Sequence, residues 1–423
     1  MSRLSAALHA ARDTKRLELG AGAIRRIADV FGEQFGPTSA VVIADPTTFK
    51  VAGREVSERM QCPHFVIDDP KLYAEMDFVD LVQRKLARYD GSIPIAVGSG
   101  TINDLTKLAA HRLGRKYLCV ATAASMDGYT AYGASITKDG SKQTFDCPAP
   151  RAVVADLDVL VAAPKEMTAS GYADLLAKIT AGADWIVADA LGVEPIDPFA
   201  WDTVQGGLRD ALMTPVDVER LTEGLMMGGF AMQAAQSSRP ASGAEHQFSH
   251  LWDMQHHTHN GVAPSHGFKV GVATVAVAEF YGEFLKLPLD ALDVDAACEA
   301  WPTRELAIAS IAKLFPQGEV RDVAMRESMI KFVERGVLRA QLLRLREVWP
   351  ALVKRLREHL PPAAELERML KAAGAPTTPQ DIGISHERLH LSFYLAFHIR
   401  RRFTVLDLAV RANVMDRVLD RIF

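Results

Sequence analysis

Six of the chain's thirteen histidines lie in one short stretch, residues 242–270, with the sequence SGAEHQFSHLWDMQHHTHNGVAPSHGFKV. Histidines at this density bind a metal, line a catalytic pocket or belong to a polar loop. His246 and His250 are four residues apart, so on a helix they share one face, and His266 opens a second helical pattern. Imidazoles together with a carboxylate such as Asp174 make a three-ligand site with open positions. That donor set suits zinc, nickel or iron as a Lewis acid toward a carbonyl or alcohol oxygen.

Parts of this pattern also have purely structural explanations. The sequence GYADLLAKITAGADW predicts a helix with Asp174 in its first turn, where the helix dipole alone favours a carboxylate. His256, His257 and His259 lie in QHHTHNG, between Gly- and Pro-containing segments, and we expect these three to be loop residues.

A second motif, AVGSGTINDLTK, places Gly98, Ser99 and Gly100 between an apolar run and the start of a helix. Glycines permit backbone angles that other residues avoid, and the N–H groups of a helix start attract an anion such as a pyrophosphate. Thr101 or Asn103 is expected to cap this helix. A simple strand-to-helix turn explains the motif equally well, because it lacks the GxGxxG fingerprint of ordinary Rossmann domains.

Polar residues that follow two other apolar runs stand where parallel sheets bind ligands. Asp127, in the run TAASMDGYTAYGASI (residues 122–136), either accepts hydrogen bonds from a polyol or phosphorylated substrate or forms an Asx turn with Gly128. Asp45 follows VVIA and either binds an adenosine ribose or forms a turn before Pro46.

Short apolar runs alternate with helical patterns over about the first 160 residues, which predicts a parallel sheet with crossover helices. The expected strands lie within residues 39–48, 62–69, 93–100, 116–124 and 151–160, and the expected helices are 77–90 and one that starts at Thr101. Later residues show mainly Ala, Leu and amphipathic periodicity, which predicts helices throughout.

We therefore expect an α/β dinucleotide-binding domain with a parallel sheet over residues 1–165, followed by an all-helical metal- and substrate-binding domain over residues 166–423. Pro164 and a turn at Ser170 and Gly171 would mark the joint. The segment after about Gly336 is rich in Arg, Leu and Glu, which predicts a C-terminal extension of surface helices.

Composition excludes several classes of protein. A chain of 423 residues exceeds what one core usually serves, and a net charge of -4 offers no basic surface for nucleic acid. The cluster RRF, residues 401–403, is expected to be a solvated helix face. Four cysteines without a CxxC motif suit a reducing compartment, and we find neither a signal-peptide core nor a run long enough to span a membrane. We expect a cytoplasmic protein with no membrane or nucleic-acid partner.

Five motifs, taken in order, resemble those of the sn-glycerol-1-phosphate dehydrogenase family, above all its longer bacterial members. They are GSGTINDLTK, TAASMDGYTAYGASI, GYADLLAKITAGADW, SGAEHQFSH and SHGFKVG, and the resemblance spans residues 15–290. It implies the fold of the dehydroquinate synthase and iron-containing alcohol dehydrogenase superfamily, with a nucleotide-binding α/β domain followed by a helical metal-binding domain. It also implies reduction of dihydroxyacetone phosphate to sn-glycerol 1-phosphate by NAD(P)H with a divalent metal.

The resemblance implies roles for the residues at the reaction centre. Asp174, His246 and His266 match the metal ligands, which hold zinc in archaeal relatives and nickel in a bacterial one. Asp127 and His250 match catalytic and substrate-contacting positions, and Asp174 also touches substrate. His250 could contact a substrate hydroxyl or relay a proton.

The resemblance also implies a set of cofactor contacts. The segment from Gly98 to Lys107 matches the loop around the pyrophosphate, and Thr122 to Ser125 match positions beside the nicotinamide ribose. With the ribose contact proposed above, the expected cofactor-binding residues are Asp45, Gly98, Ser99, Gly100, Thr101, Asp104, Thr122 and Ser125.

Two departures and several alternatives accompany this assignment. Ala131 stands where archaeal members carry Ser, so a cofactor hydrogen bond is lost and both NAD and NADP remain candidates. The segment after Gly336 is longer than in archaeal relatives and inherits no role, while Lys178 and Lys269 are candidate phosphate-binding cations. The alternatives are a glycerol or other polyol dehydrogenase, a cyclase resembling dehydroquinate synthase, and a non-catalytic sensor. A homodimer is expected from the prevalence of that state.

Overall fold

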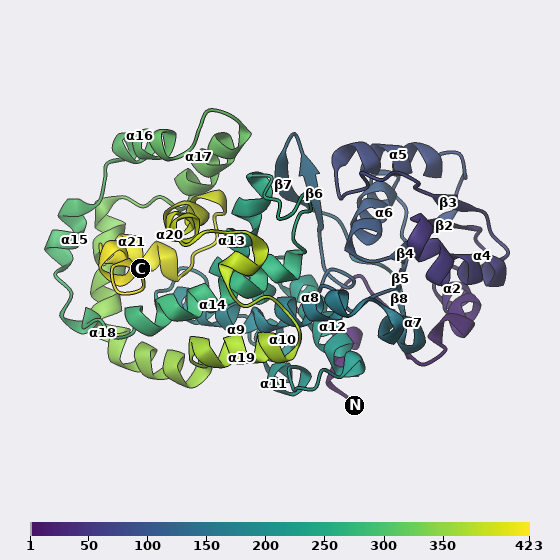
Figure 1. Cartoon of the computed structure of the whole chain (residues 1–423), viewed down its shortest axis with the longest axis horizontal. Helices are drawn as coiled ribbons and strands as arrows, with labels where there is room; N and C mark the ends of the chain where they lie inside the picture. Colours follow the sequence, from purple (N-terminus) through teal and green to yellow (C-terminus); the bar gives the residue numbers. More distant parts are fainter. Residues whose placement is uncertain (1) are drawn as a thin grey trace. The chain divides into compact units, whose positions relative to one another are not determined.

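The computed structural model describes residues 2–423 and divides the chain into two compact units (Figure 1). The sheet unit comprises the residues up to Leu175 together with Phe199–Ser238, and the helical unit comprises Leu176–Pro198 and Arg239–Phe423. The expected boundary between two independently folding domains, at residues 165 and 166, stays a prediction. By contacts alone, the division falls later in the chain and returns residues 199–238 to the sheet unit.

The sheet unit is built on a parallel six-stranded sheet with the strand order β1-β8-β5-β4-β2-β3. Its strands are β1 Arg16–Gly20, β2 Ala40–Ala44, β3 His64–Val66, β4 Ile93–Gly98, β5 Leu118–Ala121 and β8 Ala152–Asp156. Each of the five expected strands is confirmed. Strand β1 was not expected, because it lies at the sheet edge, is only half-buried and lacks a continuous apolar run.

Alternate residues of each central strand face opposite sides of the sheet, and both sides are covered. In β2, Val41 and Ile43 pack in one core cluster, with α5 (Met76–Leu86) and α6 (Gly100–Arg112). Val42 and Ala44 pack in the other, with α2 (Ile27–Phe35) and α4 (Arg54–Met60). Figure 1 shows these helix pairs on either side of the strands. Strands buried on both faces must be apolar at every position, which explains why their runs were recognisable.

The rest of the sheet unit consists of a hairpin and further helices. Strands β6 (Ala134–Lys138) and β7 (Ser141–Phe145) pair antiparallel around Asp139 and Gly140, both of which have positive φ, as a tight hairpin turn requires. The helices are α1 Arg3–Ala10, α3 Pro46–Thr48, α7 Leu157–Ala162, α8 Lys165–Leu176, α10 Pro198–Gln205, α11 Leu208–Ala211 and α12 Val218–Ala235.

Helix α8 corrects two expectations. It starts at Lys165, directly after Pro164, so Ser170 and Gly171 lie inside the helix and form no turn. Asp174 consequently lies in the last turn of α8 and not in a first turn. Gly171 is required for another reason: a Cβ atom there would lie 1.9 Å from the carbonyl oxygen of Ala124, because the helix packs directly on that backbone.

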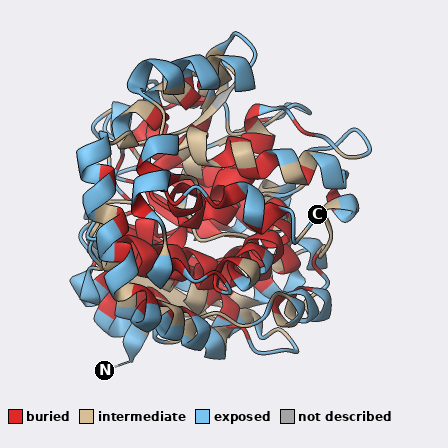
Figure 2. Cartoon of the chain, turned by 90° about the vertical axis from the view of Figure 1, so that its left-hand side faces the viewer, coloured by how far each residue is buried: buried red, intermediate tan, exposed pale blue. Residues whose placement is uncertain are grey.

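In the helical unit, the expected all-helical character is confirmed for the described residues, which form no strand after β8. The helices are α9 Lys178–Ala190, α13 Ala244–Met254, α14 His266–Phe284, α15 Val294–Ala300, α16 Arg304–Leu314, α17 Glu319–Lys331, α18 Arg335–His359, α19 Ala363–Ala372, α20 His386–Leu395, α21 Val405–Arg411 and α22 Met415–Leu419. Helices α9, α13 and α14 are buried over most of their length, and Figure 2 shows buried helices surrounded by partly exposed ones. Among residues 2–423, no helix is long and apolar enough to cross a membrane.

The expectation that the chain after Gly336 forms only surface helices is wrong. Phe393 of α20 stacks on Phe280 of α14, with ring centroids 5.4 Å apart, and packs edge-on against Phe248 of α13 at 4.9 Å. Trp349 of α18 meets Phe284 at 5.5 Å. Burying an aromatic side chain of this size contributes roughly 1.5–3 kcal/mol, so the C-terminal helices belong to the core of this unit.

Candidate active site

The glycine turn lies between β4 and α6, at the carboxyl end of the sheet. Ser99 is the N-cap residue of α6, so Thr101 and Asn103 lie inside the helix and the expectation that one of them caps it is wrong. Neither Gly98 nor Gly100 has a positive φ. Gly98 is needed because a Cβ atom there would lie 2.6 Å from Cβ of Ile102, so packing of the helix onto the strand dictates the glycine.

The loop after β5 adjoins this turn. The N–H of Thr122 donates to the carbonyl of Gly98 at 3.3 Å, which brings the ends of β4 and β5 together. Lys107, only 1% exposed, donates from Nζ to the carbonyls of Gly128, Ala131 and Gly133 at 3.1, 3.0 and 2.9 Å. This role was not expected from the sequence. A buried ammonium with three carbonyl acceptors fixes the path of the loop that carries Asp127.

Two members of the expected cofactor set have carboxylates that serve the fold. Asp45 caps α3 by accepting from the N–H groups of Thr47 and Thr48 at 2.8 and 2.9 Å, in agreement with its structural explanation. Asp104 accepts from the N–H of Ser135 at 3.0 Å and so attaches α6 to β6. Any contact of these two with a dinucleotide remains a prediction.

Helix α8 brings Asp174 to the Asp127 loop. The N–H of Asp127 donates to Oδ2 of Asp174 at 3.1 Å, and Oγ of Ser170 donates to the carbonyl of Ser125 at 3.4 Å. The close approach at Gly171, described above, lies between these two contacts along the helix. Asp127 and Asp174 are therefore held together by backbone geometry.

Asp174, His246 and His266 offer one ligand atom each within 4.8 Å of one another, among the described residues. Nδ1 of His246 bonds Oε1 of Glu245 at 2.7 Å, and Nδ1 of His266 bonds Oγ of Ser249 at 3.3 Å. With Nδ1 engaged by the protein, Nε2 of each ring is the nitrogen that could coordinate a metal. A carboxylate behind a ligating histidine fixes its tautomer and raises its basicity, which is the usual support of a protein metal site.

Glu245 is itself held firmly. It is fully buried and accepts from Oγ1 of Thr180 at 2.9 Å and from the N–H of Gly243 at 2.6 Å. Burial favours the neutral acid, but hydrogen bonding to His246, the charge of that ring and the backbone N–H groups keep the pKa of Glu245 below its ordinary value. Glu245 was not among the site residues expected from the sequence, although its position next to a candidate ligand was a usable signal.

Asp184 of α9 ties the start of α13 to the C-terminal part. It accepts from the N–H groups of Ala244 and Val405 at 2.7 and 2.8 Å and from the Tyr281 hydroxyl at 2.6 Å. Burial, followed by the repulsion of nearby Glu245, raises the pKa of Asp184 to about 7. This side chain is therefore a structural partner of the histidine helix.

His250 lies one turn after His246 on α13, with ring centroids 6.4 Å from His246 and 5.9 Å from His266. It does not belong to the three-residue ligand group. Its Nε2 instead lies 3.0 Å from Nη2 of Arg400, a contact that was not expected from the sequence. A guanidinium only donates, so it makes Nε2 the acceptor and places the proton of the neutral ring on Nδ1.

The other three histidines of the stretch lie outside the ligand group. His256, His257 and His259 lie between α13 and α14, as expected for loop residues. His257 is buried between the carbonyl of Ile382 and a guanidinium nitrogen of Arg388, at 2.6 and 2.7 Å. Burial, followed by the nearby charges, lowers its pKa.

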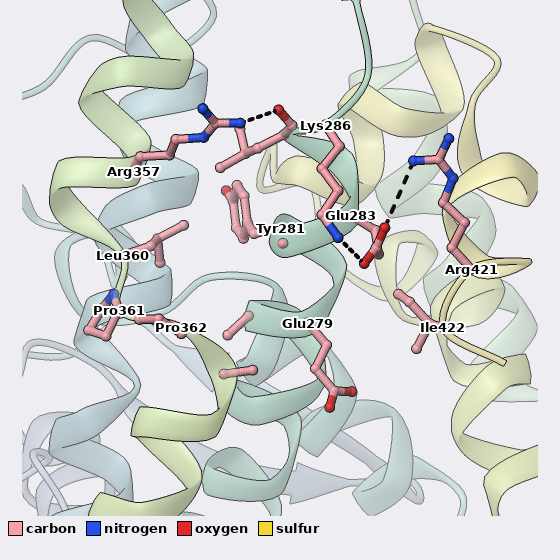
Figure 3. A pocket seen from close by; sticks show the side chains of 14 residues that line it. Glu279, Tyr281, Glu283, Lys286, Arg357, Leu360, Pro361, Pro362, Arg421 and Ile422 are labelled. Carbon is pink, nitrogen blue, oxygen red and sulfur yellow. Dashed lines mark hydrogen bonds and ion pairs between the residues drawn. The ribbon is translucent and has the colours of Figure 1, made fainter.

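Another hollow in the helical unit contains none of the expected site residues (Figure 3). It is lined by parts of α14, by the connection between α18 and α19, and by the chain end. Three of its charged residues pair with one another, since Glu283 contacts Lys286 at 2.5 Å and Arg421 at 3.8 Å. We assign no catalytic role to this hollow.

Comparison with known proteins agrees with this picture. Residues 18–164 match the family model described as iron-containing alcohol dehydrogenase. A glycerol-1-phosphate dehydrogenase (NAD(P)+) from Halalkalibacterium halodurans is 35% identical over 280 residues, which are 63% of this chain and 70% of that protein. One from Bacillus subtilis is 35% identical over 296 residues, 66% of this chain and 73% of that protein.

Among solved structures, a probable glycerol dehydrogenase from Sinorhizobium meliloti 1021 aligns with a TM-score of 0.60 at 17% identity, covering 98% of this chain and 99% of that one. At that identity the likeness concerns the fold alone. The sequence relatives decide the family: this chain belongs to the glycerol-1-phosphate dehydrogenases, which are oxidoreductases of the iron-containing alcohol dehydrogenase type.

Proposed function

We propose that this chain reduces dihydroxyacetone phosphate to sn-glycerol 1-phosphate with NAD(P)H, reversibly, and that the reaction requires one divalent ion. The observation that carries the proposal is the group of Asp174, His246 and His266 in a chain related to glycerol-1-phosphate dehydrogenases. Zinc, nickel and ferrous iron all suit a donor set of one carboxylate and two imidazoles.

The donors fit such an ion. Both histidines have Nδ1 bonded to a protein oxygen, so Asp174 and the two Nε2 atoms would hold the metal and leave positions for substrate. When bound, the ion would supply Lewis acidity toward the ketone and NAD(P)H would supply the hydride. The chain's own side chains would orient the substrate and supply the proton.

His250 is the proposed proton donor. Because Arg400 donates to Nε2, the neutral ring carries its proton on Nδ1 and can donate it to a substrate oxygen. Asp127, bonded through its N–H to Asp174, would accept a hydrogen bond from a substrate hydroxyl. This arrangement would orient the ketone and provide a proton in the same step of the reaction.

The dinucleotide would lie at the carboxyl ends of β4 and β5, where open α/β sheets bind such ligands. Ser99, Gly100 and Thr101 at the start of α6 would approach the pyrophosphate, and Thr122 and Ser125 would approach the nicotinamide ribose. For Asp45 and Asp104, whose carboxylates serve the fold, we expect replacement to reduce stability before it reduces cofactor affinity. A homodimer and a cytoplasmic location remain predictions.

The proposal is tested by following NADH and NADPH oxidation in protein reconstituted with zinc, nickel or iron, with dihydroxyacetone phosphate against dihydroxyacetone. We expect turnover of the phosphate ester, and a product that a stereospecific sn-glycerol-3-phosphate dehydrogenase ignores. Equal turnover of dihydroxyacetone would instead indicate a polyol dehydrogenase. Release of phosphate without a net change in NADH would indicate a cyclase.

Variants test the metal site directly. We expect His246→Ala to lose the bound metal and the activity, whereas His256→Ala, an exposed loop histidine, keeps both. Glu245→Gln, which weakens the support of His246, is expected to lower metal affinity roughly 10- to 100-fold. Metal content after dialysis, measured by mass spectrometry, reports binding independently of turnover. Unchanged metal content in His246→Ala would refute the proposed ligand set.

A further inference from the structure

Three consecutive arginines occupy the connection between η6 (Ala396–Ile399) and α21, where the chain forms no helix. The expectation that residues 401–403 form a solvated helix face is therefore wrong. Arg401 is exposed and pairs with both carboxylate oxygens of Glu327 at 2.9 Å. Arg400 and Arg402 are half-buried, and they contact the histidine helix and the residues directly before it.

Hydrogen bonds from side chains to backbone carbonyls fix this connection beside α13. Nε2 of Gln247 donates to the carbonyl of Arg402 at 3.1 Å, and Nη1 of Arg239 donates to the carbonyl of Phe403 at 2.8 Å. Nη1 of Arg402 donates to the carbonyl of Ser242 at 2.6 Å. The guanidinium of Arg400 thus approaches His250 from a segment that is attached at several points, which favours a preorganised site.

Positive charge accumulates at this place. Burial, and then the nearby charges of Arg239 and Arg400, lower the pKa of Arg402 to about 9, and burial lowers that of Arg400. Of the neighbouring carboxylates, Glu327 pairs with Arg401, Glu245 bonds His246, and Glu194 lies 3.3 Å from Nε of Arg239. Several guanidiniums in a partly desolvated place repel one another, and a dianion among them would relieve that repulsion.

We propose that Arg400, assisted by Arg402, binds the phosphate group of the substrate, so that the C-terminal segment completes the substrate site. The inference rests on the proposed function, since it assumes that His250 handles the reacting ketone. Three bonds separate the phosphorus from the carbonyl carbon in dihydroxyacetone phosphate. The phosphate-binding group must therefore lie within a side chain's length of the groups that handle the ketone, and the hydrogen bond from Arg400 to His250 meets this condition.

Arginine also suits the chemistry better than the lysines considered from the sequence. Its planar fork donates two parallel hydrogen bonds to phosphate oxygens. Lys269 of α14 forms an ion pair with Asp253, and both side chains are buried. Lys178 lies on the buried helix α9 and is itself fully buried. The phosphate assignment therefore goes to Arg400.

The test compares Arg400→Gln, Arg400→Lys and the matched control Arg401→Gln in metal-reconstituted enzyme with saturating NADH. For Arg400→Gln we expect kcat/KM for dihydroxyacetone phosphate to fall roughly 10- to 100-fold, as loss of a hydrogen bond between charged groups implies, mainly through KM. The low rate with unphosphorylated dihydroxyacetone should fall by a clearly smaller factor, since that substrate is affected only through the hydrogen bond from Arg400 to His250. Arg400→Lys keeps the charge without the planar fork, so its kcat/KM for dihydroxyacetone phosphate should lie between those of the parent enzyme and Arg400→Gln. Arg401→Gln should match the parent enzyme.

Equal losses for the two substrates would overturn the inference, because they would mean that Arg400 acts only through His250 or the fold and not on the phosphate. No loss with the phosphate ester would overturn it as well. The metal content and the Tm of each variant show whether it is folded. If Arg400→Gln does not fold, Arg400→Lys serves as the test.

A binding measurement separates this inference from the proposed function. Calorimetric titration of the NADH-saturated protein with sn-glycerol 1-phosphate reports phosphate-ester binding whether or not the ketone is reduced. Binding in the parent and in Arg401→Gln, with at least a tenfold weaker affinity in Arg400→Gln, supports the phosphate site even if turnover fails. Equal affinities in all three proteins, or none in the parent, would refute it.

Discussion

Replacing Gly171 with Ala tests the contact on which the site depends. A Cβ atom at this position would lie 1.9 Å from the carbonyl oxygen of Ala124. Cβ atoms in proteins essentially never approach another heavy atom closer than 3.0 Å, so this contact is about 1.1 Å too short. The neighbour is a backbone atom in the loop after β5, so no side chain can rotate away. Helix α8 or the loop must therefore move by about 1 Å.

The magnitude follows from two opposing terms. Overpacking of this kind costs up to about 3 kcal/mol, and replacing a helical glycine by Ala returns about 1 kcal/mol. A net loss of about 2 kcal/mol should lower Tm by roughly 4–8 °C in a unit of this size. The same displacement would stretch the 3.1 Å bond from the Asp127 N–H to Asp174, and a misplacement of about 1 Å costs up to about 100-fold in kcat/KM.

The matched control is Gly32→Ala in α2 of the same unit. Gly32 is exposed, and no heavy atom outside its own helix backbone and chain neighbours lies within 4 Å of its would-be Cβ atom. This variant should gain about 0.5–1 kcal/mol and raise Tm by about 1–4 °C with normal activity. Differential scanning calorimetry and steady-state kinetics would be run on both variants. If Gly171→Ala were as stable and active as Gly32→Ala, α8 would not pack on the Asp127 loop as described.

Two further changes probe other parts of the chain. Lys107→Met removes the donor for the carbonyls of Gly128, Ala131 and Gly133, which should cost about 3–5 kcal/mol of stability and lower Tm by roughly 6–20 °C. The control Lys116→Met, at an exposed lysine, should change Tm little. Equal Tm values for the two variants in calorimetry would contradict the role of the buried lysine. Burial, and then the charge of Lys331, lower the pKa of His398 to about 3, so the folded state holds this ring neutral while the unfolded chain protonates it below pH 6.5. The free energy of unfolding is therefore highest above the unfolded pKa of 6.5 and decreases as the pH falls toward 3. The loss should be about 2 kcal/mol between pH 6.5 and 5, and His398→Asn should show a correspondingly flatter stability curve in urea titrations.

The sheet could be predicted because its central strands are buried on both faces. That burial demands apolar residues at every position, and the runs containing Val41, Ile95 and Val153 show it directly. Edge strand β1 and the polar hairpin β6–β7 carry no such demand and were not expected. Gly171 illustrates a different limit: a glycine required by a close approach has the same letter as one required by a turn, so its residue type could not show that α8 continues through it.

The candidate metal ligands show how much residue spacing alone can predict. An interval of four residues places His246 and His250 on one helix face, but coordination depends on what each ring nitrogen bonds, and Arg400 engages His250 across 150 residues of chain. Family motifs selected His266 in place of His250, since they carry information about three-dimensional neighbours that periodicity lacks. Arg400 lies beyond the last of those motifs, in a cluster whose composition favours a solvated surface. Its position was decided by Gln247, Arg239 and backbone carbonyls that hold the segment against α13. A charged residue that contacts a candidate site residue can therefore resemble a surface residue in the sequence, because the partners that bury it lie far away along the chain.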